Sequence, residues 1–131
     1  MAFLAVALGG ALGAVLRWVL GDAVPDAGGF PWTTFVINVS GSAVLAGLPL
    51  FEVVRHNHTL AAGLGPGLLG GYTTLSAYSE QTRALLDDGR TATALLYLFG
   101  TLAACLVAVA LVSGLQPPGA GDAFAAEGGD E

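Results

Sequence analysis

Four long apolar stretches, separated by short polar joints, account for most of this sequence. They cover about residues 2–20, 31–51, 59–86 and 91–115 of the 131-residue chain. A bilayer core about 30 Å thick is crossed by about 20 apolar residues in helical conformation. A mean hydropathy of +0.72, with 54% hydrophobic and only 11% charged residues, suits lipid and not water. The sequence therefore predicts an all-α membrane protein with four transmembrane helices.

The remaining composition narrows the classes of function. The chain has no lysine, and its four arginines face ten acidic residues, for a net charge of −6. This balance argues against nucleic-acid binding and against a polybasic lipid-binding patch. The arginines specify membrane orientation only weakly, which permits insertion in either direction. We expect residues 1–115 to form the membrane domain and residues 116–131, rich in Pro, Gly and acids, to form a disordered acidic tail.

The third apolar stretch contains a polar run near its middle. Within Gly65–Glu80 a double glycine, Gly70 and Gly71, is followed by polar groups at six of the next eight positions. Backbone that leaves the helix at membrane depth persists only where protein buries it or where it lines a cavity, and its amides and carbonyls can hold ions. One interpretation is an ion site where this helix breaks near the bilayer centre. The alternative is a glycine-kinked helix whose hydroxyls bond to carbonyls one turn back.

Polar side chains also occur in the other stretches. The carboxamide of Asn38 needs partners from another helix, from water or from a permeating ion. Arg17, close to a helix end, either anchors or packs the first helix or lines an aqueous vestibule. Tyr97, Thr101 and Cys105 share one helix face at i, i+4 and i+8. That stripe is either packing or a line of donors along a pore.

Small residues predict how the first helix packs. Gly9, Gly10 and Gly13 form a face with the Gly-x-x-x-Gly spacing that lets membrane helices approach closely. The lone Cys105 lies inside the fourth stretch, so the chain has no disulfide framework and no CxxC metal pair.

Three short motifs, in the right order on three of the four stretches, resemble the small fluoride channels known as Fluc or CrcB proteins. They are Gly9-Gly10-x-x-Gly13-Ala14-x-x-Arg17, then Thr34-Phe35-x-x-Asn38-x-x-Gly41, then Gly70-Gly71-Tyr72-Thr73-Thr74-x-Ser76. The resemblance implies a fluoride-specific channel in a prokaryotic cell membrane, which exports cytoplasmic fluoride passively and protects against its toxicity. It also implies an antiparallel, dual-topology dimer with two pores, each lined by both subunits.

The resemblance assigns individual residues as well. Carbonyls of Gly70 and Thr73 are implied to hold a structural sodium ion at the dimer interface. Asn38 is implied to donate to fluoride, and hydroxyls of Ser76 and of the stripe from Tyr97 to Thr101 are implied to line the path. Neutral donors suit fluoride, a small and strongly hydrated anion that a ring of fixed cations would trap.

One position departs from the family pattern. The family carries two phenylalanines, three residues apart, whose ring edges face the ion, and this chain has Leu75 and Tyr78 there. Leucine has no electropositive ring edge. The active assembly is therefore either a homodimer in which Tyr78 and the hydroxyls suffice, or a heterodimer with an oppositely oriented, phenylalanine-bearing paralogue.

Two other functions are alternatives to a channel for a sequence of this kind. A four-helix, dual-topology drug/proton antiporter has a similar length, but it needs a titratable carboxylate inside the membrane. Here Glu52 lies at the end of a stretch and Glu80 lies beyond the break. A non-transporting assembly subunit would leave the line of polar residues unexplained. The sequence contains no catalytic triad, nucleotide motif or metal cluster, so we do not predict an enzyme.

Overall fold

The computed structural model describes residues 1–24 and 29–122, and the regular structure in these residues is helical throughout. Residues 25–28 of the first joint and residues 123–131 of the predicted tail lie outside the described residues. By length and composition, three helices in the described part of the chain could cross a membrane. They are α1 (Ala2–Ala23), α2 (Trp32–Gly47) with its 3₁₀ extension η1 (Leu48–Leu50), and α7 (Thr91–Ser113).

The third apolar stretch forms several shorter pieces. After a short helix in the joint, α3 (Glu52–Arg55), the chain continues through α4 (His58–Ala62), η2 (Gly63–Leu69), α5 (Gly70–Tyr72) and α6 (Leu75–Asp87). The η2 segment is a π-helix and contains Pro66, which lacks the N–H that an α-helix would pair with the carbonyl of Ala62. No piece of this stretch is long enough to qualify by itself as a membrane-spanning helix, since α6, the longest, has 13 residues.

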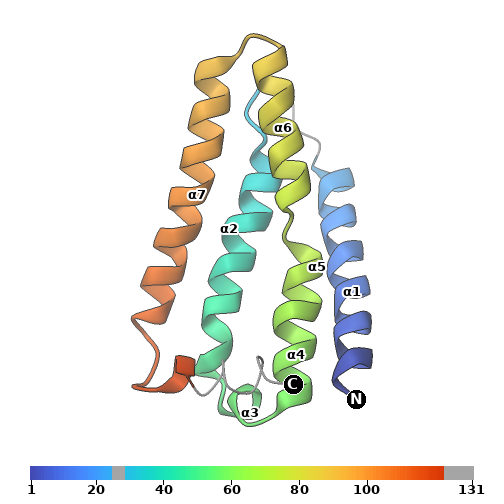
Figure 1. Ribbon diagram of the computed structural model, residues 1–131, viewed down its shortest axis with the longest axis vertical. Coiled ribbons are helices and arrows are strands. Elements are labelled where there is room, and N and C mark those ends of the chain that lie inside the picture. The colour runs from blue at the N-terminus through green and yellow to red at the C-terminus, as the bar shows by residue number, and fades with distance from the viewer. Residues whose placement is uncertain (25–28, 123–131) are drawn as a thin grey trace.

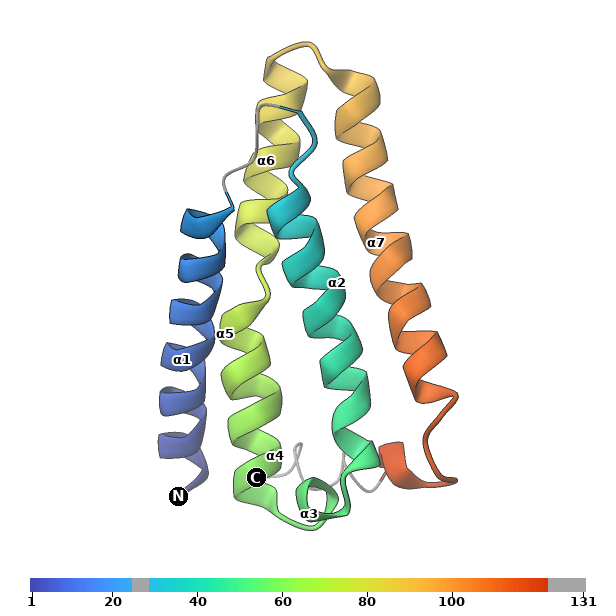
Figure 2. The same cartoon turned by 180° about the vertical axis from the view of Figure 1, so that it is seen from behind.

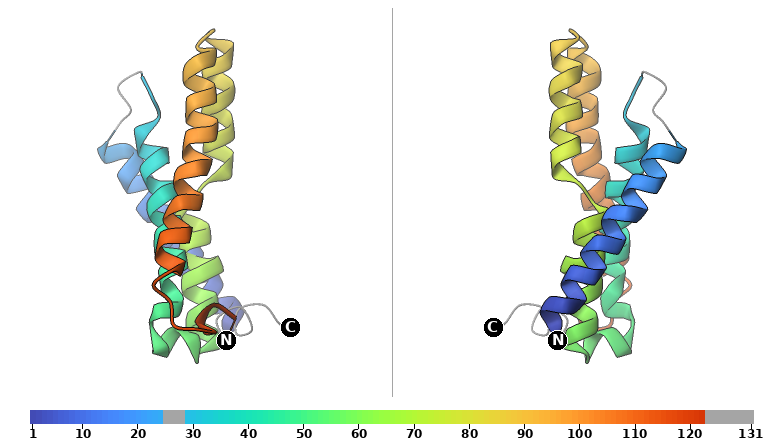
Figure 3. Two further views of the ribbon diagram at one scale, coloured as in Figure 1. Left: turned by 90° about the vertical axis from the view of Figure 1, so that its left-hand side faces the viewer. Right: turned by 90° about the vertical axis from the view of Figure 1, so that its right-hand side faces the viewer.

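The helices pack side by side, roughly parallel to one axis (Figure 1). Helix α1 packs along η2 and α5, α2 packs along α7, and α6 packs against α7. Seen from behind, α2 lies between α7 and the α4–α5 column (Figure 2). The side views show that α6 and α7 diverge from α1 and from the start of α2 at one end of the molecule (Figure 3).

Glycines of α1 bring its backbone against the backbone of the third stretch. A Cβ atom on Gly9 would lie 2.2 Å from the carbonyl oxygen of Gly63, and one on Gly13 would lie 2.0 Å from that of Leu68. From the other side, a Cβ atom on Gly71 would lie 2.3 Å from the carbonyl oxygen of Gly10. The predicted small-residue packing face of α1 is thereby confirmed.

The outer surface is apolar, as expected for a protein surrounded by lipid. Large exposed side chains occur along all three long helices and include Phe3, Leu12, Val36, Phe99, Leu106 and Leu111. Some of the buried apolar side chains form two small clusters. One contains Leu48, Val54, Ala61 and Leu69, and the other contains Leu85, Ala94 and Tyr97.

The residues that follow α7 turn back toward α2. Gln116, the first residue of the predicted tail, donates from Nε2 to the carbonyl oxygen of Ala46 at 2.6 Å, and Ala120 is only 2% exposed. Pro49 has no N–H to offer this carbonyl in a 3₁₀ turn, so the Gln116 amide replaces the missing donor. The described end of the chain therefore lies below α7 and beside the end of α2, at the same end of the bundle as α3 (Figure 1).

We expect Gly13→Ala to lower the thermal stability of the purified protein, because the added methyl group would overlap a backbone carbonyl that cannot rotate away. Overpacking of this kind costs about 1–3 kcal/mol. The matched control is Gly21→Ala on the same helix, where no atom lies within 4 Å of the added Cβ. The control should keep or raise the melting temperature in detergent. Equal melting temperatures for the two variants would contradict the packing.

Candidate functional site

The helix of the third stretch is interrupted at Thr73 and Thr74. Thr73 has φ −73° and ψ 159°, and Thr74 has φ −147° and ψ 116°, so both residues are extended. The hydroxyl oxygen of Thr74 then accepts from the N–H of Ala77 at 3.1 Å and caps the start of α6. The chain thus leaves one helix and enters the next within two residues.

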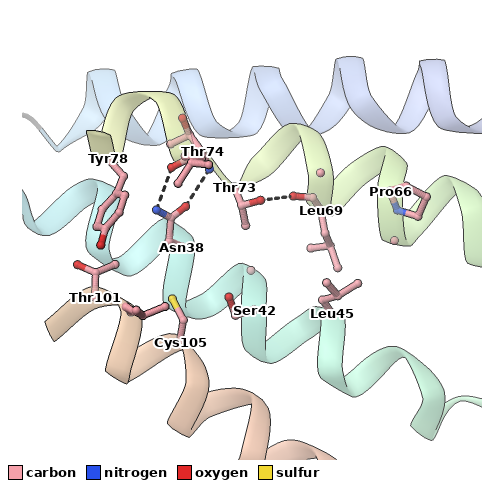
Figure 4. A pocket seen from close by; sticks show the side chains of 15 residues that line it. Asn38, Ser42, Leu45, Pro66, Leu69, Thr73, Thr74, Tyr78, Thr101 and Cys105 are labelled. Atoms are coloured by element: carbon pink, nitrogen blue, oxygen red, sulfur yellow. Dashed lines mark hydrogen bonds between the residues drawn. The ribbon is translucent and has the colours of Figure 1, made fainter. Parts of the chain in front are cut away.

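The carboxamide of Asn38 on α2 holds this interruption (Figure 4). Its Oδ1 accepts from the N–H of Thr74 at 2.8 Å, and its Nδ2 donates to the carbonyl of Thr74 at 3.0 Å. Thr74 is only 8% exposed, and a buried backbone group without a partner costs about 1–3 kcal/mol. Asn38 therefore satisfies both backbone groups at the point where the helix gives up its own hydrogen bonds.

This pairing leaves other backbone carbonyls without their helical donors. In a continuous helix the N–H of Thr74 would bond to Gly70 and the N–H of Ala77 would bond to Thr73. Here the N–H of Thr74 donates to Oδ1 of Asn38, and the N–H of Ala77 donates to the hydroxyl oxygen of Thr74. The carbonyl of Gly71 accepts instead from Nε of Arg17 at 3.2 Å. The carbonyls of Gly70 and Thr73 thus lose the donors that a continuous helix would give them.

Neighbouring contacts fix the end of α5. A Cβ atom on Gly41 would lie 2.4 Å from Cγ2 of Thr73, so only glycine lets α2 approach this closely. The hydroxyl of Tyr72 lies 3.2 Å from Oγ of Ser40. The hydroxyl of Thr73 donates to the carbonyl of Leu69 at 2.9 Å, one turn back. The chain thus combines the back-bonded hydroxyl of the kinked-helix interpretation with a real interruption of the helix.

A cavity of about 550 Å³, termed the large cavity, opens beside the interruption between α2, the third stretch and α7. Its walls are mostly apolar, with polar groups from a few residues. Most of the predicted ion-binding residues meet there: Asn38, Gly70, Thr73, Leu75, Tyr78 and Thr101, together with Thr74 and Cys105. In Figure 4, Thr101 and Cys105 project from α7 toward the side where Asn38 and Tyr78 lie.

A second cavity of about 430 Å³, termed the polar cavity, lies between α1, α2 and α6. Arg17, Thr33, Thr34, Asp22 and Gln81 line it, and Thr74 lines both cavities. Arg17 is half-buried and bonds to Gly71, so its guanidinium faces the protein interior. The interruption therefore separates a polar space from a mostly apolar one.

The predicted pore residues have unequal environments. Leu75 is 76% exposed at the rim of the large cavity. Tyr78 donates its hydroxyl to the carbonyl of Leu98, which fixes its ring between α6 and α7. Thr101 is 3% exposed, and within the described residues its hydroxyl has no hydrogen-bond partner.

Two predicted pore residues do not line the large cavity. Ser76 is exposed, and its hydroxyl lies 3.2 Å from that of Thr74. Tyr97 is fully buried, donates to Oε1 of Gln81 at 2.8 Å and stacks edge-on against Phe30. Gln81 is not among the residues predicted from the sequence, although its position one turn after Tyr78 places it on the same helix face.

Acidic side chains lie away from the large cavity. Among the residues that the structure describes, no Asp or Glu lines it, and Glu52 and Glu80 are both exposed. A proton-coupled antiporter needs a carboxylate that the substrate path can reach. The described walls of the large cavity accordingly offer neutral donors and carbonyls.

Comparison with known proteins identifies the family. The sequence profile described as CrcB-like protein, Camphor Resistance (CrcB), matches residues 4–115, which include every helix from α2 to α7 and nearly all of α1. The chain belongs to the CrcB family. This confirms the resemblance seen in the three short motifs.

Curated relatives of this CrcB chain are similar along most of its length. Fluoride-specific ion channel FluC 1 of Streptomyces coelicolor is 45% identical over 111 residues, 82% of this chain and 72% of that protein. FluC 2 of Nocardia farcinica is 42% identical over 114 residues, 85% of this chain and 81% of that protein. FluC of Thermus thermophilus is 46% identical over 104 residues, 76% of this chain and 82% of that protein.

We expect Asn38→Ala to speed hydrogen exchange at the interruption, because the Thr74 amide would lose its acceptor. Loss of one hydrogen bond worth about 1.4 kcal/mol raises the open population about tenfold. Exchange of the peptide that contains Thr74 can be followed by mass spectrometry. Ser40→Ala is the control, since it removes a neighbouring α2 hydroxyl that does not bond to Thr74. Unchanged exchange in Asn38→Ala would contradict the assigned role.

Proposed function

We propose that this CrcB chain forms a fluoride-specific ion channel that exports cytoplasmic fluoride passively and so lowers its toxicity. The observation that carries the proposal is the set of neutral donors around the large cavity. Asn38 uses one of its two Nδ2 hydrogens on Thr74, and the buried hydroxyl of Thr101 has no partner within the described residues. Donors of this kind can replace the water that surrounds fluoride without trapping the ion. The names of the relatives point to the same ion. A channel of this kind is not an enzyme.

The proposed setting is the plasma membrane of a prokaryote, with several crossings by the chain. Residues 58–87 would supply the fourth crossing, as a span broken near the bilayer centre at Thr73 and Thr74. Arg17 in the polar cavity would raise the local fluoride concentration before the ion reaches Asn38. A negative-inside potential then drives the anion outward by about 2.3 kcal/mol per 100 mV.

The assembly we propose is an antiparallel, dual-topology dimer with a structural sodium ion between the subunits. Gly70 is exposed, and the donors of the Gly70 and Thr73 carbonyls are diverted to other acceptors. Two such pairs, one from each subunit, would form an oxygen-only site that suits a hard cation. The sodium ion would hold the two interruptions together, while lipid covers the outer faces of the helices.

We expect Asn38→Asp to lower fluoride efflux from proteoliposomes more than about tenfold. The carboxylate keeps an acceptor for Thr74 but repels the anion, and a like charge at 4 Å costs about 4 kcal/mol at an effective dielectric constant near 20. A fluoride electrode measures the flux, and a parallel chloride trace measures selectivity. Asn57→Asp is the control, since Asn57 only caps α4 through its side-chain oxygen.

Three results of this experiment would count against the proposal. Fluoride flux in Asn38→Asp within about twofold of the unmodified chain would remove Asn38 from the path. Equal release of chloride from the unmodified protein would exclude a fluoride-specific channel. Proton-coupled exchange of an organic cation would favour the antiporter instead.

We expect Leu75→Phe to raise fluoride efflux from proteoliposomes that contain this chain alone. The side chain is 76% exposed at the cavity rim, so a ring fits there and adds the electropositive edge that leucine lacks. Leu86→Phe, on an exposed leucine of the same helix, is the control. Co-reconstitution with a phenylalanine-bearing homologue should raise the flux in the same way if the active assembly is a heterodimer. Full flux from the unmodified chain, improved by neither change, would show that a homodimer suffices.

A further inference from the structure

Cys105 is the only cysteine in the chain, and it lies on the α7 wall of the large cavity. It is half-buried and follows Thr101 by one helical turn, so the two side chains share a face. Figure 4 shows its sulfur atom on the side of α7 that faces α2, where Asn38 lies. The thiol therefore opens onto the same space as the proposed fluoride donors.

The neighbouring Thr101 gives an independent sign that this wall faces a polar occupant. Thr101 is only 3% exposed, and within the described residues its hydroxyl has no hydrogen-bond partner. A buried hydroxyl left unpaired costs about 1–3 kcal/mol, unless water or an ion in the cavity pairs with it. Both residues lie in the middle of α7, a helix long enough to span a membrane. Water or an ion beside Thr101 would therefore lie at membrane depth and one helical turn from Cys105.

We propose that Cys105 is a modification site for small thiol-specific electrophiles, and that its modification blocks the conduction path. The inference rests on the proposed channel function. With methyl methanethiosulfonate, the thiolate of Cys105 attacks the sulfur that carries the methyl group. A disulfide to the methylthio group forms, methanesulfinate leaves, and the thiol proton goes to water. The added sulfur and methyl group then occupy the space in front of Asn38 and Thr101.

Modification of this kind makes fluoride export sensitive to thiol chemistry. The step is reversible, because a dithiol reductant releases the methylthio group and regenerates the thiol. A serine at the same position cannot react, so Cys105→Ser separates the chemistry of the thiol from its place in the cavity wall.

The test measures fluoride efflux from proteoliposomes before reagent, after reagent and after dithiothreitol, while intact-mass spectrometry counts added methylthio groups. We expect one added group, at least tenfold slower efflux and recovery on reduction. Cys105→Ser should gain no mass and keep its own starting efflux rate. The matched control adds Leu106→Cys to Cys105→Ser, since Leu106 is 61% exposed on the outer surface of α7. It should gain the same mass without losing efflux.

The possible results are distinct. Complete labelling of Cys105 with unchanged efflux would show that the thiol lies off the path, and no labelling would show that it is inaccessible, so either result overturns the inference. Equal inhibition of the Leu106→Cys control would also overturn it, because a methylthio group on the outer surface would then slow efflux as much as one in the cavity. Absence of fluoride efflux before reagent is added would instead refute the proposed function itself.

Discussion

The pairing of the Asn38 carboxamide with the Thr74 backbone is the interaction on which the rest of the site depends. A helix cannot stop inside an apolar environment unless something else bonds to the groups it leaves unpaired. Asn38 bonds to both groups of Thr74, at 2.8 and 3.0 Å, and the Thr74 hydroxyl starts α6. The start of α6 and the loss of the helical donors of Gly70 and Thr73 follow from that arrangement, and Thr74 lines both cavities.

Close backbone packing keeps the interruption in place. Gly9, Gly13 and Gly71 bring α1 against the third stretch at distances that no side chain would allow. Gly41 does the same between α2 and Thr73. The contacts of Gly9, Gly13 and Gly71 are made with backbone atoms, which have no rotamers to change, while Gly41 meets the side chains of Thr73 and Tyr72. The position of Asn38 relative to Thr74 is therefore set by closely packed elements. A donor set meant to replace a hydration shell needs this kind of preorganisation.

Some features of the site could be predicted from the sequence, and others depend on contacts that spacing alone does not specify. The glycine face of α1 follows from residue spacing, and the run of polar residues after Gly71 marks the part of the chain that cannot lie in lipid as a plain helix. The partner of Asn38 could not be predicted, because an amide in an apolar helix has several chemically equivalent choices. The contact of Gln116 with Ala46 could not be predicted for a similar reason, since it depends on the donor that Pro49 lacks. Tyr97 shares a helix face with Thr101, yet its hydroxyl donates to Gln81 on α6, and Tyr97 does not line the large cavity.

A single chain leaves polar backbone where lipid would have to cover it. Gly70 is exposed, its carbonyl has lost the Thr74 donor, and the mostly apolar large cavity opens beside it with Leu75 at the rim. An unsatisfied carbonyl in hydrocarbon costs several kcal/mol, and within one chain Arg17 relieves only the neighbouring carbonyl of Gly71. In the proposed assembly, a second subunit that brings its own diverted carbonyls, together with a hard cation between the two sets, would remove that cost. The break that creates the proposed ion path would therefore also favour the proposed dimer.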